Sequence, residues 1–343
     1  MTKRRINLAL QGGGAHGAFS WGVLDRLLQA DDIEIAAISG TSAGALNAAA
    51  LKAGMAMGGR QGARDNLDWF WGEISRIDDL SPANWFTLFW PDSLKQMTRA
   101  FSPAAAMDGL THLLSPYDYG PFYRNPLSSL VEGLHFDHIC GPDGPALFIA
   151  ATNVRTGKVR VFTGAEVGPD ALLASTCLPT VFRAIEIVDP ATGISEAYWD
   201  GGYSGNPALF PLFDPALPQD IVIVAINPLV RDTLPRSAGE ILDRINEISF
   251  NSAFLRDLRA IQFVRRLIAD GKVAPGVMKD VFVHMIADNA LMNSLSAETK
   301  TLPTPGLIER LKEAGRAAAE RFLATNGDQI GLSGTVDLEA TYG

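Results

Sequence analysis

The sequence predicts an α/β fold in which a mostly parallel sheet carries helices on its faces. The first sixty residues alternate between short apolar runs and stretches whose apolar side chains have helical spacing. Glycine-containing turns separate these segments, and apolar runs of strand length recur after residue 145. Such alternation is typical of a parallel sheet, because parallel neighbours need a crossover connection that is usually a helix.

The N-terminal elements follow from these patterns in order. Residues 6–10 form an apolar run that ends at glycines, which is typical of a buried strand. Residues 15–29 place apolar side chains three and four positions apart and predict a helix. Residues 33–38 predict a second strand, and the alanine-rich residues 43–53 predict a second helix. We expect this helix to end near Gly54.

Residues 60–145 break the alternation and predict a helical, aromatic-rich insertion that caps one end of the sheet. Recurring prolines favour short helices and loops over strands. Aromatic residues gather in its first third, at Trp69, Phe70, Trp71, Trp85, Phe86, Phe89 and Trp90. Packing within the cap explains this cluster, and so does an interfacial lid or acyl-chain channel. Substitution of Trp85 and Trp90 would distinguish the two interpretations.

The core pattern resumes beyond the insertion. Strands are predicted at residues 146–152, 159–162, 184–188 and 221–226. Amphipathic helices are predicted at 237–271 and 305–324, and Arg256, Asp257 and Arg259 fit a solvated face of the first. There is no internal repeat or low-complexity linker, so we expect one domain over residues 1–325 and a tail at 326–343, mainly loop.

Composition excludes several classes of protein. With 47% hydrophobic residues the chain can bury a core, which argues against disorder. The net charge of −9 and the lack of basic runs beyond residues 3–5 argue against nucleic-acid binding. Two cysteines provide neither a disulfide framework nor a four-thiolate zinc site. No signal peptide or transmembrane run is evident, so we expect a cytoplasmic protein that can touch a membrane peripherally.

The pentapeptide Gly40-Thr41-Ser42-Ala43-Gly44 matches G-x-S-x-G. It follows an apolar strand and precedes an alanine-rich helix, which is the context of a nucleophilic serine on a tight strand-to-helix turn. The positive end of the helix dipole would lie near the hydroxyl. A chance match, in which Gly40 and Gly44 serve only a turn, is the alternative.

A glycine-rich stretch, Gln11 to Gly17, links the first predicted strand to the first helix. Gly12, Gly14 and Gly17 satisfy G-x-G-x-x-G, the dinucleotide-binding pattern. That interpretation needs an acidic residue at the end of the second strand, where the sequence has the serine turn. The backbone N–H groups of Gly12, Gly13 and Gly14 suit an oxyanion hole instead. Both turns follow neighbouring strands, so we expect them to face one pocket.

A serine nucleophile needs a base. His16 lies in the glycine loop, and the pair His135 and His138 lies in the insertion without the acidic residue of a zinc motif, so no metal site is predicted. His284 is a late triad candidate, although its surroundings indicate a strand. Asp200, in Asp200-Gly201-Gly202, is the remaining candidate, although this tripeptide alone predicts only a turn.

Taken in order, G-G-G-x-x-G, G-T-S-A-G and D-G-G resemble the motifs of the patatin-like phospholipase family. Residues 174–179 resemble its A-S-x-x-x-P block, and Asn206-Pro207 follows the last motif as in the family. The match extends in pieces over residues 5–230. The set is specific, although each motif alone is weak.

This resemblance implies a three-layer α/β/α architecture and a hydrolase that cleaves carboxylic esters of lipids, of phospholipase A or lysophospholipase type. Ser42 would attack the ester carbonyl and form an acyl-enzyme, and Asp200 would be the base. Gly12, Gly13 and Gly14 would form the oxyanion hole. Supporting turns would be made by Gly17, Gly40, Gly44, Gly201 and Gly202. No cofactor is implied.

Two alternatives stay open. One is a non-catalytic protein that captures a lipid or nucleotide through the loop Gly12 to Gly17, but such a protein has no need of both Ser42 and Asp200. An NAD-dependent oxidoreductase is disfavoured by the missing acidic residue. The family often has Arg or Lys at the position of His16, which is mostly neutral near pH 7. We expect little change in activity between about pH 6 and 8 if His16 is structural.

Overall fold

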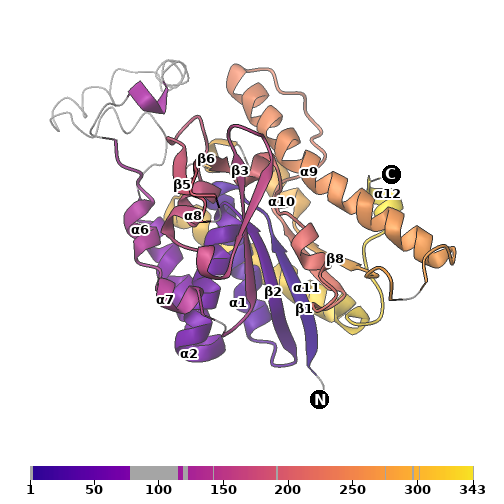
Figure 1. Ribbon diagram of the computed structural model, residues 1–343. Helices are drawn as coiled ribbons and strands as arrows, with labels where there is room; N and C mark the ends of the chain where they lie inside the picture. Colours follow the sequence, from indigo (N-terminus) through magenta and orange to yellow (C-terminus); the bar gives the residue numbers. More distant parts are fainter. Residues whose placement is uncertain are drawn as a thin grey trace.

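The computed structural model describes residues 3–77, 115–118, 123–141, 143–190, 192–274, 276–295, 297–300 and 302–342 (Figure 1). Within them one sheet contains β1 (Arg4–Leu10), β2 (Ile33–Thr41), β3 (Ala146–Asn153), β4 (Val159–Thr163), β5 (Ile185–Val188), β6 (Ser195–Asp200), β7 (Asp220–Ala225) and β8 (Phe282–Ala287). The strand order is β5-β6-β3-β2-β1-β7-β8, and β4 pairs with β3. Strands β3, β2, β1, β7 and β8 are mutually parallel, whereas β4, β5 and β6 pair antiparallel.

The helices connect and cover these strands. The α-helices are α1 (Gly17–Leu28), α2 (Ala43–Ile74), α6 (Ser128–Glu132), α7 (Phe136–Ile139), α8 (Pro169–Ser175), α9 (Ala238–Ala269), α10 (Asn289–Ser294), α11 (Pro305–Asn326) and α12 (Leu338–Tyr342). Short 3₁₀ turns are η1 (Gly14–His16), η3 (Gly164–Glu166), η4 (Gly201–Tyr203), η5 (Phe210–Phe213), η6 (Ala297–Lys300) and η7 (Gly327–Gln329).

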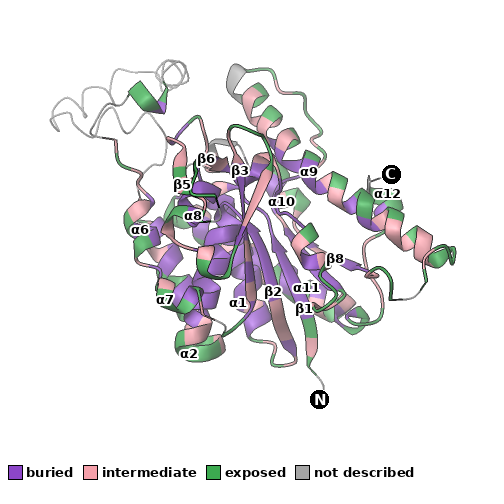
Figure 2. Ribbon diagram, in the orientation of Figure 1, coloured by how far each residue is buried: buried purple, intermediate pink, exposed green. Residues whose placement is uncertain are grey.

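Alternate residues of the central strands enter two separate cores, which produces three layers. Leu8 and Leu10 of β1 pack with α1, α2 and α11 on one face of the sheet. Ala9, between them, packs on the other face with Phe254 and Leu258 of α9. Successive strand side chains point to opposite faces, so both faces of a central strand are apolar. Figure 2 shows these strands buried between the helices. The predicted three-layer α/β/α fold is confirmed.

Helix α2 differs from its predicted length. The sequence indicates an end near Gly54, but helical structure continues to Ile74 and is interrupted only at Gly58 and Gly59, whose φ/ψ angles are not helical. A Cβ atom on Gly54 would lie 2.3 Å from the carbonyl oxygen of Gly62. Gly54 therefore permits close contact between the two halves of α2, and the chain turns four residues later.

The predicted cap is only partly covered by the structure. Helices α6 and α7 and the end of α2 belong to it, and the aromatic side chains of Phe70 and Trp71 are buried. Trp85 and Trp90 lie outside the described residues, as do Phe86 and Phe89, so the cap and lid interpretations stay predictions.

The C-terminal third follows the predicted helices closely. Helices α9 and α11 occupy nearly the ranges expected from their spacing. Beyond Asn326 the sequence predicts mainly loop, but a short helix, α12, places the buried Leu338 in the core beneath α9. None of the helices in the described parts of the chain combines the length and apolarity needed to cross a bilayer.

Candidate active site

Ser42 occupies the turn between β2 and α2. Its φ of 53° is positive, a value that glycines alone share with it among the described residues. Such a conformation costs on the order of 1–3 kcal/mol in a non-glycine residue and persists where its surroundings enforce it. A Cβ atom on Gly40 would lie 2.7 Å from the carbonyl oxygen of Gly44, and one on Gly44 would lie 2.2 Å from that of Leu10. The turn therefore requires both glycines of G-x-S-x-G.

Ser175, at the end of α8, holds the backbone of this turn. Its Oγ accepts a hydrogen bond from the N–H of Ser42 at 2.9 Å and donates one to the carbonyl oxygen of Ala150 at 2.7 Å. The side chain is fully buried. It connects the strained Ser42 to β3, the strand next to β2. The sequence places Ser175 in the A-S-x-x-x-P block but gives no sign of this contact.

The glycine loop packs directly against Ser42. A Cβ atom on Gly12 would lie 2.5 Å from the Cβ of Ser42, and one on Gly17 would lie 2.6 Å from that of Ala43. Gly14 has a φ of 58°, and a Cβ atom there would lie 2.3 Å from the carbonyl oxygen of Lys300. The loop and the serine turn thus face each other, as expected from strands that end at the same edge of the sheet.

The N–H groups of this loop are not equivalent. Gly12 donates its N–H to Oδ1 of Asn206 at 2.6 Å, and its carbonyl oxygen accepts from Nδ2 of Asn227 at 2.6 Å. Among the described residues, the N–H groups of Gly13 and Gly14 have no hydrogen-bond partner. Unpaired donors at the start of η1 suit a negatively charged oxygen. The amides of Gly13 and Gly14 are therefore better placed for an oxyanion than that of Gly12.

Asp200 ends β6 and is fully buried. Its Oδ1 accepts a hydrogen bond from the N–H of Gly202 at 2.7 Å. Its Oδ2 has no partner within the described part of the chain. A Cβ atom on Gly201 would lie 2.1 Å from the carbonyl oxygen of Ala150, and one on Gly202 would lie 2.7 Å from the ring of Phe250. The Asp-Gly-Gly turn therefore fits tightly between β3 and α9.

Asp200 lies beside the serine turn. Thr41 Oγ1 donates to the carbonyl oxygen of Gly205, which joins the residue before Ser42 to the segment after Asp200. Burial raises the pKa of Asp200 to about 7, although the N–H of Gly202 and the side chain of Ser42 act to lower it. The carboxyl is thus adjacent to Ser42, with one buried oxygen unpaired and its proton affinity raised by desolvation.

An apolar pocket adjoins Ser42. Its described lining comes mainly from α2 and from residues around α6 and α8: Gly14, Ala15, Ser42, Ala43, Leu46, Phe70, Trp71, Ile74, Leu127, Thr176, Leu178, Val181, Phe182, Lys300 and Pro303. Lys300 is the one charged side chain in this set. Phe70 and Trp71 belong to the aromatic cluster that the sequence singled out, so part of that cluster lines the space beside the candidate nucleophile.

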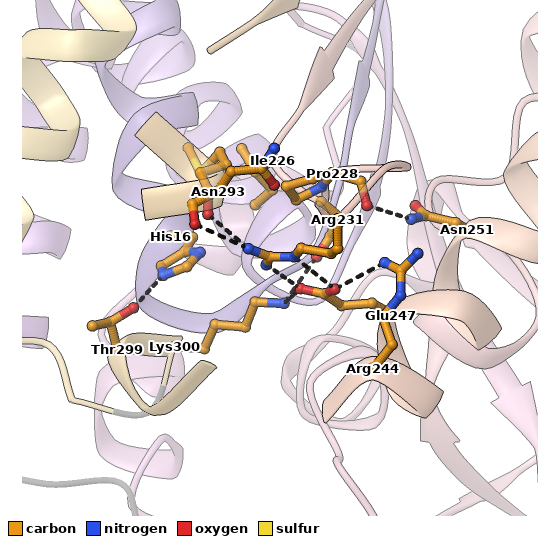
Figure 3. A network of polar contacts seen from close by, with 12 residues as sticks. His16, Ile226, Pro228, Arg231, Arg244, Glu247, Asn251, Asn293, Thr299 and Lys300 are labelled. Carbon is orange, nitrogen blue, oxygen red and sulfur yellow. Dashed lines mark hydrogen bonds and ion pairs between the residues drawn. The ribbon is translucent and has the colours of Figure 1, made fainter. Parts of the chain in front are cut away.

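A network of charged side chains lies near His16 of the glycine loop (Figure 3). The buried carboxylate of Glu247 binds Arg231, Arg244 and Lys300. Burial acts to raise the pKa of Glu247, but hydrogen bonds and charges from Arg231 and Lys300 hold it at about 2. His16 donates or accepts through Nε2 with Thr299 at 2.7 Å.

His16 is neutral in this environment. Burial, together with the charges of Lys300 and Arg231, lowers the pKa of His16 to about 3. Sequence reasoning did not identify Lys300 or Glu247, because both come from C-terminal segments that carry no motif. Asn206 was visible only as part of an Asn-Pro pair, without a role.

The other histidine candidates lie elsewhere. His284 on β8 is buried, and its Nε2 contacts Asp220 at 2.9 Å while its Nδ1 contacts Thr335 at 3.0 Å. Asp220 begins β7, whereas Ser42 follows the opposite end of β2. His284 therefore does not serve Ser42. No group of three or more metal-ligating side chains occurs in the described ranges.

The model of the family described as patatin-like phospholipase matches residues 8–213, which is 206 of 343 residues. A search of curated proteins found no match.

The comparison with solved structures gives matches of low sequence identity and low TM-score. VipD from Legionella pneumophila is 15% identical with a TM-score of 0.42, and the alignment covers 94% of this chain and 67% of that one. Human GIVD cytosolic phospholipase A2 is 12% identical with a TM-score of 0.40, and the alignment covers 95% of this chain and 59% of that one. The ExoU–SpcU complex of Pseudomonas aeruginosa is 18% identical with a TM-score of 0.31, and the alignment covers 94% of this chain and 53% of that one. The chain thus spans one half to two thirds of these proteins. Because the family model matches more than half of this chain, the chain belongs to the patatin-like phospholipase family of lipid acyl hydrolases.

Proposed function

We propose that this protein hydrolyses carboxylic esters of lipids through an acyl-enzyme on Ser42, with Asp200 as the base. The observation that supports this best is the environment of Asp200. It is a fully buried carboxyl with one unpaired oxygen, and it lies beside a serine held at positive φ. A carboxylate with a raised pKa is a stronger base than an exposed one, and a buried unpaired oxygen can receive a proton.

The steps follow from this arrangement. The hydroxyl oxygen of Ser42 attacks the ester carbonyl carbon while its proton passes to Asp200. The amides of Gly13 and Gly14 stabilise the oxyanion, and Gly12 keeps the loop in contact with Ser42. Collapse breaks the bond to the alcohol, which takes the proton from Asp200. Water, deprotonated by Asp200, then attacks the acyl carbon. The bond to the oxygen of Ser42 breaks, Asp200 returns the proton to that oxygen, and the fatty acid leaves.

The pocket supports a lipid-like acyl group. Its described lining is largely aliphatic and aromatic, as acyl-chain burial requires. We propose substrates of phospholipase A or lysophospholipase type on this ground and on family membership. A dinucleotide site needs an acidic residue at the end of β2, but β2 ends at Thr41 and Ser42 follows it. In addition, Asn206 and Asn227 form hydrogen bonds with the peptide groups of Gly12. Both observations argue against a dinucleotide site.

A fluorophosphonate probe tests the nucleophile. Wild type is expected to be labelled at Ser42 alone, because only an activated serine attacks the phosphorus. Ser42→Ala should not be labelled, and Asp200→Asn should react at least a hundredfold more slowly. Ser252→Ala, which removes an exposed serine on α9, is the matched control and should label as wild type does.

The labelled peptide is identified by mass spectrometry, with and without detergent micelles. Folded wild type that stays unlabelled under both conditions would overturn the proposal and favour a binding protein that uses the Gly12 to Gly17 loop. Labelling only with micelles would support a hydrolase that acts at an interface.

A further inference from the structure

The outward face of α9 has an unusual composition for a helix that covers a sheet. Residues spaced three or four positions apart lie on one side of a helix. Eight exposed residues of α9 have this spacing: Ile241, Ile245, Ile248, Ser252, Arg256, Arg259, Phe263 and Arg266. We call them the α9 face. Its first half is aliphatic, and its second half carries three arginines and a phenylalanine.

The aliphatic half is well exposed. Ile241, Ile245 and Ile248 are 44%, 57% and 52% exposed, and Phe263 is 52% exposed. Figure 2 shows exposed and partly exposed residues along this helix, where α9 projects beyond the end of the sheet. The loop before α9 adds Leu234, which is 83% exposed. Contiguous exposed apolar residues on a folded protein mark an interaction site.

Acidic side chains of α9 point away from this face. Glu240 caps the start of the helix, where its Oε2 accepts from the N–H groups of Arg236 and Ser237. Glu247 is buried in the charged network, and Asp257 accepts from the N–H of Leu209.

Asp243 completes the acidic set of α9 and lies three and four residues from Glu240 and Glu247, on their side of the helix. The charged members of the α9 face are all arginines, and Arg256 and Arg266 are exposed, on a chain whose net charge is −9. A local positive face on an acidic protein favours a negatively charged partner.

The opposite side of α9 is tied to the catalytic turn. Phe250 packs against Gly202, and its ring meets that of Tyr203 edge to face at 5.1 Å between centroids. Tyr203 follows Asp200 in the same turn. A partner bound at Ile248 and Ser252 is thus about one helix diameter from the Asp-Gly-Gly turn.

We propose that the α9 face docks on a lipid surface that contains anionic lipids. Aliphatic side chains enter the boundary between headgroups and acyl chains, while Arg256 and Arg266 pair with lipid phosphates, as in helices that lie in a membrane interface. A zwitterionic surface would bury the isoleucines but would lack the net negative charge that attracts the arginines. The proposal concerns a surface that is separate from the chemistry of Ser42, so it can be tested without any activity measurement.

Vesicle flotation tests this proposal with the full chain. Vesicles contain either phosphatidylcholine alone or equal parts phosphatidylcholine and phosphatidylglycerol. Wild type should bind the anionic vesicles, and added salt should weaken the binding. Arg256→Gln with Arg266→Gln should weaken it about 25-fold, since each cation near such a surface contributes about fivefold. Ile245→Gln with Ile248→Gln should weaken it at least tenfold.

Controls separate the α9 face from general effects. Arg310→Gln with Arg321→Gln also removes two positive charges, from exposed residues of α11, and Leu332→Gln removes an apolar side chain that is 71% exposed elsewhere. Both should bind as wild type does. All variants should hydrolyse a monomeric short-chain ester at the wild-type rate. If wild type itself does not hydrolyse this ester, the result counts against the proposed function and not against docking.

Two results would overturn the proposal. One is equal binding of wild type to both kinds of vesicle, or binding that neither α9 pair changes. The other is no vesicle binding together with a dimer in sedimentation that Ile245→Gln with Ile248→Gln dissociates. The α9 face would then be the interface with a second copy of this chain.

Discussion

At the scale of single residues, the candidate site depends on two side chains in costly states. Ser42 adopts a backbone conformation that glycine alone shares with it among the described residues, and Asp200 is a carboxyl shielded from water. Each state is maintained by neighbours that lack chemical roles of their own. The N–H of Ser42 is bound by Ser175, and the N–H of Gly202 satisfies one oxygen of Asp200. The other oxygen of Asp200 has no partner among the described residues and is the proton acceptor in the proposed mechanism.

The pH profile follows from the raised pKa of Asp200. A base must be ionised, so kcat/KM on a soluble ester should rise about tenfold per pH unit below about pH 7 and level off above it. His16, with a pKa of about 3, should not contribute. This differs from the nearly constant activity between about pH 6 and 8 that His16 alone implied. Rates from about pH 5 to 9 check this.

His16→Gln is the control for the profile and should keep the same inflection. An inflection that moves or disappears in this variant would assign the ionisation to His16. A profile without any inflection near neutrality would contradict a buried carboxylate base.

Ser175 makes a second residue-scale prediction. Ser175→Ala removes the acceptor of the buried Ser42 N–H and a donor to the carbonyl oxygen of Ala150, at a cost on the order of 1–3 kcal/mol. We expect kcat to fall at least tenfold with little change in KM, because the substrate pocket is untouched while the nucleophile shifts. Steady-state kinetics below the melting temperature measure this.

Ser20→Ala is the matched control, since Ser20 is buried and its Oγ has no partner among the described residues. It should retain wild-type kcat. Equal kcat in Ser175→Ala and wild type would show that the bridge to β3 is dispensable.

At the scale of elements, close backbone contact fixes where helices lie. A Cβ atom on Gly315 of α11 would lie 2.0 Å from the carbonyl oxygen of Phe19, and one on Gly22 of α1 would lie 1.9 Å from that of Lys312. Alanine at position 315 favours helix formation by about 1 kcal/mol but forces the helices apart. Gly315→Ala should therefore lower the free energy of unfolding by roughly 1–3 kcal/mol.

Gly306→Ala tests the same change on the same helix, where a Cβ atom meets nothing within 4 Å. It should leave stability unchanged or raise it by up to about 1 kcal/mol. Urea unfolding of both variants gives the comparison. If both substitutions stabilise alike, the contact between α1 and α11 is looser than described.

Elements with local signals were predictable from the sequence, whereas contacts between distant elements were not. Strand β1, the serine turn and α9 follow from apolar spacing and glycines within a few residues. The continuation of α2 past Gly54 was missed, because that glycine serves packing against Gly62 instead of ending the helix.

The partners of the candidate site illustrate the same limit. Asn206 binds the peptide of Gly12 across 194 positions, and Lys300 reaches the loop from near the end of the chain. Spacing within a motif cannot specify a contact whose other half lies in a different part of the sequence.

At the scale of the whole molecule, charge and shape are distributed unevenly. The chain has nine more acidic than basic residues, yet α9 presents a basic and aliphatic side to solvent. The same helix packs its inner side on the sheet and on the Asp-Gly-Gly turn. One element therefore connects the proposed docking surface with the candidate base.

The position of β1 between β2 and β7 has a consequence for synthesis. β7 begins at Asp220 and β8 ends at Ala287, so both leave the ribosome after residues 8–213. Until then one side of β1 is an open edge, with apolar side chains and unpaired backbone groups that attract other strands. This edge of β1 can be covered only once β7 (Asp220–Ala225), its neighbour in the sheet, has been synthesised.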